Sequence, residues 1–265
     1  MAAGAPPRLG VVVVAAGSGE RLGSGGPKAL VELAGRPLLA HALAGLAAAG
    51  LPPAVVVHPP GAAEAVACAL DGLPVAARVP GGATRTDSVR AGVAALADDV
   101  EVVVVHDAAR PLTPPAVIAA AVAAVTGPAA GIATADAAAD ATGAGEPVLA
   151  AAPALALVDT LKRVEGDQVV ATVDRAGLVG VQTPQVFPRA VLERALAPDA
   201  QAGEATDDLA LVERLRDRGE LAGRIVTVPG SEWGRKVTYP HDLAFLALLA
   251  AHAAPTTTDA EGAPW

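Results

Sequence analysis

The chain has 265 residues, carries a formal net charge of −9 and is 52% hydrophobic, yet only 2% of its residues are aromatic. So much apolar content argues against a disordered chain, while the acidic charge and the scarcity of aromatic stacking platforms exclude a general nucleic-acid binder. The single cysteine, Cys68, excludes an internal disulfide framework, and we expect it to be a small buried thiol in a protein of a reducing, cytoplasmic compartment.

The N-terminal half alternates short apolar runs with alanine- and leucine-rich segments of helical length. The apolar runs predict strands at Leu9–Ala15, Ala54–His58, Val75–Val79 and Glu101–His106. The segments between them predict helices at Pro37–Ala49, Ala62–Asp71 and Thr86–Ala97. A further helix is expected to begin at Pro114-Pro115, after the cap-like Thr113.

Strands that are apolar throughout and alternate with helices are typical of an α/β fold, here a Rossmann-like, mostly parallel sheet with helices on both faces. Ligands of such sheets bind beyond the carboxyl ends of the strands, which places function in the loops after Ala15, Val79 and His106. No positively charged region precedes the first valine run, and Pro52-Pro53 interrupts the most apolar segment. We therefore expect neither a secretory leader nor a membrane span.

The C-terminal half is less regular. Ala135–Pro153 is almost all small or polar and is predicted to be a flexible insertion. Leu155–Val164 and Gln168–Val173 predict two strands of a hairpin arm, at about residues 155–175. Helices are expected at Arg189–Leu196, Asp207–Arg218 and His241–Ala253, and a strand at Arg224–Val228. We expect one domain over residues 1–254 and a disordered tail over 255–265.

The first predicted strand runs into a long glycine-rich loop from Ala15 to Lys28. Such a loop lets backbone N–H groups approach phosphate oxygens. The loop is not the dinucleotide fingerprint, because Leu22 stands where G-x-G-x-x-G needs glycine, and it has no Gly-Lys pair of a P-loop. Arg21 and Lys28 bracket it, and two cations suit a triphosphate because phosphoryl transfer depends largely on positioning and charge stabilisation. A solvated turn with incidental charges is the alternative.

Further polar groups follow the other strands. Asp107 could hold ribose hydroxyls or a metal-bound phosphate and Arg110 a phosphate, unless the two merely form an ion pair that caps a loop. His106 is interpreted as structural, and the scattered histidines with one cysteine give no spacing for a protein-built transition-metal site.

Four motifs remain, and three of them have a simple structural interpretation. Gly81-Gly82 could approach a flat base and Ser88 could form one specific hydrogen bond, although a plain turn with Thr86 as helix cap fits equally well. Thr206-Asp207-Asp208 is interpreted as a helix N-cap, and Gln182-Thr183-Pro184-Gln185 as a possible turn. Lys236 is a candidate anion-binding cation before a helix.

Taken together, these segments resemble the 2-C-methyl-D-erythritol 4-phosphate cytidylyltransferases of the non-mevalonate isoprenoid pathway. The matched pieces are AAGSGERLG…PK, GG-x-x-R-x-DSV-x-AG, VHDAARP, DT-x-K, V-x-R-x-GL, QTPQ-x-F, TDD and K-x-T-x-P-x-DL, in family order from about Val13 to Leu243. The resemblance implies transfer of CMP from CTP to methylerythritol phosphate with release of pyrophosphate. It also implies Mg²⁺ bound mainly through the CTP phosphates, and a homodimer whose protruding β-arm crosses the two-fold axis.

The resemblance also assigns roles to individual residues. Those implied as catalytic are Arg21, Lys28 and Lys236. Those implied to bind the nucleotide are Ala15, Ala16, Gly17, Gly19, Gly82, Ser88 and Asp107. Those implied to bind the methylerythritol phosphate are Asp107, Arg110, Thr160, Arg175 and Thr183, with Thr160 and Arg175 reaching the neighbour's nucleotide site. No metal ligand is assigned to the protein. Ala83 departs from the pattern, since family members often carry Asp there, beside cytosine.

Other functions remain open from the residues alone. A cytidylyltransferase for another polyol phosphate, such as ribitol 5-phosphate, would carry similar nucleotide motifs. A sugar-1-phosphate or molybdopterin nucleotidyltransferase would share the glycine loop but lack the arm with Thr160 and Arg175. A non-catalytic nucleotide-binding subunit would not need Arg21, Lys28 and Lys236 at one phosphorus. No nucleic acid or membrane partner is expected.

Overall fold

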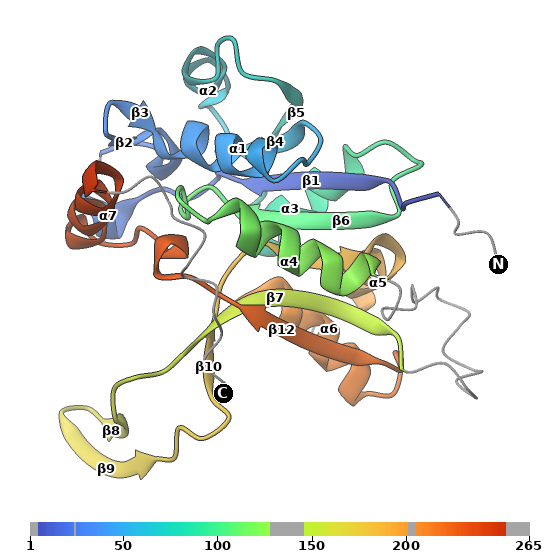
Figure 1. Cartoon of the computed structure of the whole chain (residues 1–265), viewed down its shortest axis with the longest axis vertical. Helices are drawn as coiled ribbons and strands as arrows, with labels where there is room; N and C mark the ends of the chain where they lie inside the picture. Colours follow the sequence, from blue (N-terminus) through green and yellow to red (C-terminus); the bar gives the residue numbers. More distant parts are fainter. Residues whose placement is uncertain (1–4, 24, 128–145, 201–204, 253–265) are drawn as a thin grey trace.

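The computed structural model of the chain describes residues 5–23, 25–127, 146–200 and 205–252. Its centre is an eight-stranded sheet of order β10-β7-β11-β6-β1-β4-β5, in which β12 also pairs with β7 (Figure 1). The strands of this sheet are β1 (Leu9–Val14), β4 (Ala54–His58), β5 (Val75–Pro80), β6 (Val102–Asp107), β7 (Val148–Ala156), β10 (Val179–Val181), β11 (Gln185–Pro188) and β12 (Arg224–Pro229). A short hairpin, β2 (Glu32–Leu33) and β3 (Arg36–Pro37), lies apart from it.

The predicted parallel core is confirmed in β1, β4, β5 and β6, which pair in parallel. Their valine-rich sequences suit strands covered on both faces, because a branched side chain packs well on either side of a pleated sheet. The chain runs outward from β1 through β4 to β5 and then returns to β6 on the other side of β1. Strand order therefore reverses at β1, and the loops beyond β1 and β6 diverge there to leave room for a ligand.

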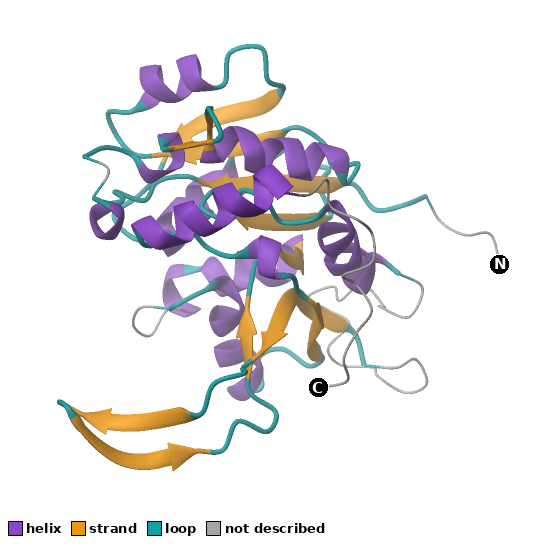
Figure 2. Cartoon of the chain, turned by 60° about the vertical axis from the view of Figure 1, so that its left-hand side comes forward, coloured by secondary structure: helices purple, strands orange, loops and turns teal. Residues whose placement is uncertain are grey.

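Helices cover both faces of the sheet, as predicted (Figure 2). One face carries α1 (Leu38–Ala48), α2 (Ala63–Ala69) and α4 (Pro115–Thr126). The opposite face carries α3 (Arg85–Ala94), α5 (Arg189–Leu196) and α6 (Asp208–Asp217). Alternate valines of β1 enter the two cores: Val12 packs with α3, whereas Val11 and Val13 pack with α1 and α4. Helix α7 (Pro240–His252) lies beside β2 and β3.

The prediction for Ala135–Pro153 is wrong in its last part. Residues 135–145 lie outside the described residues, but Val148–Ala156 forms β7, a strand whose first seven residues are buried. It lies between β11 and β10 and also pairs with β12. Alanine has no strong strand signal of its own. Burial between neighbouring strands and helices, rather than propensity, makes this segment a strand.

The predicted hairpin arm exists with shifted bounds, as β8 (Leu161–Glu165) and β9 (Gln168–Val173). Its first strand begins at Leu161 rather than Leu155, because Leu155 still belongs to β7. Among the described strands β8 and β9 pair only with each other, and they project from the body of the molecule (Figures 1 and 2). Val164, Val169 and Val170 of the arm are exposed. An isolated two-stranded hairpin is marginal in water, so these apolar residues favour a partner surface.

Cys68 is exposed on α2, so the prediction of a buried thiol is wrong. The helix is short and buries only Val66 along its length, which leaves Cys68 on its outer side. None of the helices that the structure describes combines the length and the apolar character needed to cross a bilayer. The predicted tail over 255–265 lies outside the described residues.

Candidate active site

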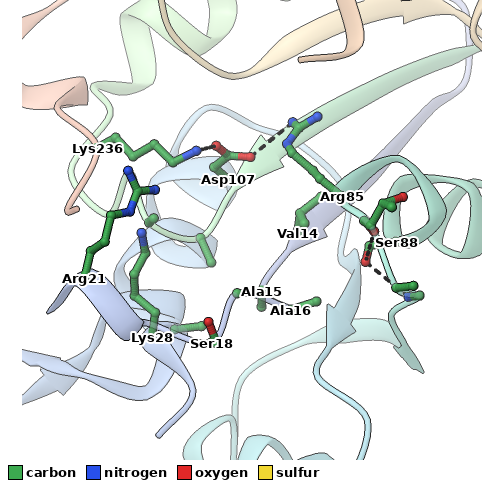
Figure 3. Close-up of a pocket in the computed structure, with 17 residues that line it drawn as sticks. Val14, Ala15, Ala16, Ser18, Arg21, Lys28, Arg85, Ser88, Asp107 and Lys236 are labelled. Carbon is green, nitrogen blue, oxygen red and sulfur yellow. Dashed lines mark hydrogen bonds and ion pairs between the residues drawn. The ribbon is translucent and has the colours of Figure 1, made fainter. Parts of the chain in front are cut away.

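A cavity of about 450 Å³ opens at the switch point, beyond the carboxyl ends of β1 and β6 (Figure 3). Its walls come from the glycine loop, the start of α3, the loop after β6 and Lys236, so segments far apart in sequence meet here as predicted. Of the residues assigned by resemblance, those that line it are Ala15, Ala16, Gly17, Arg21, Lys28, Gly82, Ser88, Asp107 and Lys236. The register that pairs Val14 with Asp107 brings the first and third of these segments together.

The glycine loop is folded so that both of its cations return to the cavity. Gly19 has φ of 78°, a left-handed conformation that glycine adopts without strain, and the chain turns there into a 3₁₀ turn, η1 (Glu20–Leu22), that carries Arg21. The backbone N–H of Lys28 donates to the carbonyl of Gly17 at 3.2 Å and closes the loop. Gly19 itself is not among the residues that line the cavity, so the structure gives it a part in shaping the loop.

A small apolar cluster fixes two of the cations through their sequence neighbours. Leu22 and Val237 are buried together with Leu33, Leu38 and Leu246. Leu22 follows Arg21, and Val237 follows Lys236. The N–H of Val237 also donates to the carbonyl of Ala109 at 2.8 Å, which ties this segment to the loop after β6. Packing beneath the cavity thus holds side chains that lie more than 200 positions apart in sequence on one wall.

The cations are close enough to perturb one another. Partial burial, followed by the nearby Lys236, lowers the pKa of Lys28 to about 8, and Arg21 acts in the same direction. No ion pair holds Arg21 or Lys28 among the described residues; Arg21 instead lies over the ring of Tyr239, 5.9 Å from its centroid. Bringing cations together without counter-ions opposes their charged forms. An anionic ligand would relieve this repulsion.

Asp107 is the carboxylate at the centre of the site. Its Oδ2 accepts from the Lys236 ammonium at 2.6 Å, and its Oδ1 accepts from the Arg85 guanidinium at 3.2 Å. Burial alone would raise the pKa of Asp107, but Arg85 and Lys236 hold that pKa well below its ordinary value. Asp107 is therefore ionised, and it pairs with Arg85 and Lys236 rather than with Arg110, the ion pair that the sequence offers as an alternative.

The turn before α3 forms the wall of the cavity that the resemblance assigns to cytosine. Thr84, rather than Thr86, caps this helix: its hydroxyl accepts from the N–H of Asp87 in a reciprocal capping box. The hydroxyl of Ser88 donates to the carbonyl of Thr84 at 3.0 Å and accepts from the N–H of Gly82 at 3.2 Å. A Cβ at Gly82 would lie 2.3 Å from that of Asp87, so this position requires glycine. Ser88 thus shapes the loop as well as facing the cavity.

A second cavity of about 350 Å³ adjoins the first and shares Lys236 with it. Arg110 lines this second cavity, together with Leu157, Val158 and Asp159 at the base of the arm. The Arg110 guanidinium donates to the carbonyls of Gly234 at 2.7 Å and Val181 at 3.3 Å, which fixes its direction. Its Nε is buried and has no hydrogen-bond partner among the described residues. Arg110, Arg235 and Lys236 outnumber the carboxylates of Asp159 and Glu232 in its lining, so the cavity can receive an anionic group.

The remaining assigned residues line neither cavity. Thr183 is buried behind Asp107: its hydroxyl accepts from the N–H of Asp107 at 3.1 Å and lies 3.0 Å from His106 Nδ1. His106 is structural as interpreted, since burial lowers its pKa to about 4 and keeps the ring neutral. Thr160 and Arg175 are exposed at the base of the arm, where the Arg175 guanidinium donates to the carbonyls of Leu157 and Val158.

Sequence reasoning misses Arg85 and Asp208. Arg85 stands in the quoted GG-x-x-R motif without a role, and the sequence pattern makes Asp208 part of an ordinary helix cap. Asp207 is indeed the N-cap of α6, accepting from the N–H of Ala210, but Asp208 is fully buried against Arg85. Their pairing joins α3 to α6 across a long stretch of sequence. The only signal in the sequence is that neither a turn before α3 nor an N-cap of α6 needs the charge of Arg85 or of Asp208.

No cluster of three or more metal-ligating side chains occurs among the residues that the structure describes. Asp107 is the single carboxylate among the described residues lining the first cavity, and both of its oxygens face cations. This arrangement fits a metal ion carried in on phosphate groups better than one held by the protein.

A mostly parallel sheet with a cation-flanked glycine loop at its switch point defines a Rossmann-like α/β protein built to receive a nucleotide. The chain belongs to the 2-C-methyl-D-erythritol 4-phosphate cytidylyltransferase (IspD) family, whose model matches it over residues 9–147 and 134–250. The resemblance found in the sequence is thereby confirmed.

Individual relatives agree with this membership. The chain is 43% identical to the 2-C-methyl-D-erythritol 4-phosphate cytidylyltransferase of Frankia casuarinae, over 95% of this chain and 84% of that protein. It is 46% identical to a bifunctional IspD/IspF enzyme of Clavibacter michiganensis, over 89% of this chain but only about half (53%) of that longer protein. The crystal structure of the Thermus thermophilus cytidylyltransferase superposes with a TM-score of 0.70 at 30% identity, covering 92% of this chain and 99% of that one.

Proposed function

We propose that this chain transfers CMP from CTP to 2-C-methyl-D-erythritol 4-phosphate, giving 4-diphosphocytidyl-2-C-methyl-D-erythritol and pyrophosphate. The observation that carries the proposal is that Arg21 and Lys28 of the glycine loop and the distant Lys236 line one cavity at the switch point. Two of these cations lack a counter-ion among the described residues. Family membership supplies the identity of the nucleotide and of its acceptor.

The reaction makes one bond and breaks one. An oxygen of the acceptor phosphate attacks the α-phosphorus of CTP, the bond from that phosphorus to the bridging oxygen breaks, and pyrophosphate leaves. Charge accumulates on the phosphoryl oxygens, and cations aimed at it stabilise the transition state. Arg21 and Lys28 take this part beside the glycine loop. Lys236, on the boundary of both cavities, aligns the attacking phosphate with the α-phosphorus.

The nucleotide and acceptor then occupy adjoining cavities. Backbone groups from Ala15 to Gly17 contact the nucleotide phosphates and ribose, and the turn with Gly82 and Ser88 reads cytosine. Arg110 faces the acceptor in the second cavity. Asp107 stands between the two and is available to the ribose or to acceptor hydroxyls. Thr183, which the resemblance assigns to the acceptor, then acts on it through Asp107, whose backbone N–H donates to the Thr183 hydroxyl.

In this proposal Mg²⁺ is bound mainly by the phosphates of CTP. When bound, Mg²⁺ neutralises part of the phosphate charge and so assists departure of pyrophosphate. The residues around the first cavity leave it to the phosphates, because the carboxylate of Asp107 is already committed to Arg85 and Lys236. We also propose that the described chain acts as one domain, in a reducing, cytoplasmic compartment.

Pyrophosphate release tests the function directly. The purified chain is offered each nucleoside triphosphate against methylerythritol phosphate, ribitol 5-phosphate and a sugar 1-phosphate. We expect the fastest release with CTP and methylerythritol phosphate. Equal or faster release with ribitol 5-phosphate would replace the proposed acceptor. Nucleotide binding without release from any pair would favour a non-catalytic subunit.

A homodimer with shared sites is part of the proposal. The exposed valines of β8 and β9 support it, because an isolated hairpin with apolar residues in water favours a partner surface. The exposed Thr160 and Arg175 would then reach the nucleotide site of the neighbouring chain and bind methylerythritol phosphate there. In this arrangement a complete site needs Arg21 from one chain and Arg175 from the other.

Mixed dimers test this arrangement. Chains with Arg21→Ala and with Arg175→Ala, each inactive alone, are mixed until subunits exchange at random. Half of the dimers are then mixed, and each mixed dimer has one intact and one doubly damaged site, so roughly one quarter of wild-type activity should return. Recovery near zero, with subunit exchange confirmed by native mass spectrometry, would mean that each site is built within one chain.

A further inference from the structure

Arg85, which lines the first cavity, pairs with two buried carboxylates, Asp107 and Asp208; Figure 3 shows the pair with Asp107. Its Nη2 is 3.2 Å from Asp107 Oδ1, and its Nη1 is 2.8 Å from Asp208 Oδ2. The side chains of Asp107 and Asp208 are only 9% and 1% exposed. Burial alone would lower the pKa of Arg85, but the two carboxylates raise it above the ordinary value. Arg85 is thus a fixed positive charge with both ends of its guanidinium engaged.

Asp208 depends on Arg85 in return. Neither carboxylate oxygen of Asp208 has a well-aligned hydrogen bond among the described residues, which leaves the Arg85 ion pair as its compensation there. Burial raises the pKa of Asp208, and Arg85 opposes that rise. The backbone around Asp208 is itself rigid, because its N–H and that of Leu209 both donate to Oε1 of the buried Gln185. Asp208 is therefore a firm anchor for the guanidinium.

Ion pairs link Asp208 to Arg85, Arg85 to Asp107 and Asp107 to Lys236, so Lys236 is the last member of the series. Its side chain is 39% exposed, and it is held by a 2.6 Å contact with Asp107 Oδ2. An ion pair of a partly exposed lysine is weak when both partners are free to move. Here one partner is not free, because Arg85 occupies Oδ1 and the Thr183 hydroxyl accepts from the Asp107 N–H. The direction of the Asp107 carboxylate therefore decides where the ammonium of Lys236 lies.

We propose that Arg85, anchored by Asp208, is a positioning residue that orients Asp107 and, through it, places the ammonium of Lys236 on the boundary between the two cavities. The proposal rests on the proposed function, in which Lys236 aligns the attacking phosphate. Buried charge networks are seldom better for stability than well-packed apolar groups, so stability alone does not account for this one. A misplacement of ~1 Å can cost about a hundredfold in rate, which gives the network a catalytic consequence.

Asp208→Asn is the sharpest variant, because it is nearly isosteric and Asp208 does not line either cavity. Loosening the anchor should lower kcat/KM for methylerythritol phosphate at least about tenfold, while the CTP dissociation constant changes less than about threefold. Asp217→Asn is the matched control: it makes the same chemical change at the other end of the same helix, where Asp217 is exposed and pairs with Arg216 rather than with Arg85. The control should keep wild-type kinetics.

A double-mutant cycle separates positioning from general damage. In a Lys236→Ala background, measured by single turnover at high enzyme concentration, Asp208→Asn should cost less than about twofold, because the cation that it positions is gone. A parallel readout needs no turnover: acceptor affinity in the presence of a CTP analogue with a non-hydrolysable α–β bridge should fall in Asp208→Asn and stay unchanged in Asp217→Asn. If Asp208→Asn does not fold, Arg85→Lys, which retains the charge but cannot span both carboxylates, takes its place.

The outcomes are distinct. Equal losses with and without Lys236, no loss in either, or an equal loss in Asp217→Asn would each overturn the positioning role. A large fall in CTP affinity on Arg85→Lys would mean that Arg85 contacts the nucleotide directly, which also overturns it. A wild-type chain that releases no pyrophosphate would instead refute the proposed function.

Discussion

Raising the pH should remove the positive charge of Lys28 within a range that enzymes tolerate. An ordinary lysine stays charged up to about pH 10, but burial and the neighbouring Lys236 lower the pKa of Lys28 to about 8. The charged form is the one that stabilises the transition state, so activity is lost as the pH rises through this pKa. With one critical proton, kcat/KM for CTP should be about half of its plateau at pH 8 and about one tenth at pH 9.

The assay is steady-state pyrophosphate release between pH 6.5 and 9.5 with methylerythritol phosphate saturating. Because kcat/KM reports the free enzyme and kcat the complex, the fall in kcat should appear at higher pH, where bound phosphates stabilise the ammonium. Lys28→Arg is the control, since a guanidinium remains charged throughout: its rate should be lower but free of the alkaline fall.

A second variant tests the cause of the shift. The negative charge of Asp107 supports the protonated form of Lys28, so Asp107→Asn should move the alkaline fall to still lower pH. A fall that begins only above about pH 9.5, or one that persists unchanged in Lys28→Arg, would refute the assignment of this titration to Lys28.

Three other expectations concern single side chains. Arg21→Ala should lower kcat about a hundredfold or more with little change in the CTP dissociation constant measured by calorimetry, because its charge acts mainly in the transition state; a raised KM with unchanged kcat would contradict this. Ala83→Asp should increase the preference for CTP over UTP in competition assays, and equal discrimination would mean that backbone and Ser88 alone read the base. Tyr239→Leu should lower kcat roughly two- to fivefold by removing the ring beneath Arg21; an equal loss in an Arg21→Ala background would rule out that route.

The central sheet is predictable because its signal is local. The valine runs of β1, β4 and β6 are buried over most or all of their length, and a strand of this kind is recognisable from its own residues. The position of the glycine loop follows from the same pattern, because ligand loops of parallel sheets follow the carboxyl ends of strands. Arg21 and Lys28 can therefore be assigned to one site from the amino-acid sequence alone.

The strands β7 and β11 are not predictable in the same way. Val148–Ala156 is rich in alanine, and Gln185–Pro188 is only four residues long, so neither has a pattern that separates strand from loop. Each becomes a strand because neighbours on both sides supply hydrogen-bond partners. The pairing of Arg85 with Asp208 is also a consequence of tertiary packing, since α3 and α6 meet only when both cover the same face of the sheet.

An acidic chain can bind anionic ligands when the cations at its site are not neutralised by ion pairs. The net charge of −9 is spread over the molecule, and at physiological ionic strength its influence is screened beyond about 8 Å. Inside the first cavity the balance is local: Arg85 is neutralised by Asp107 and Asp208, whereas no ion pair holds Arg21 or Lys28 among the described residues. Adding one carboxylate beside the glycine loop would therefore weaken phosphate binding more than any change in the charge of the outer surface.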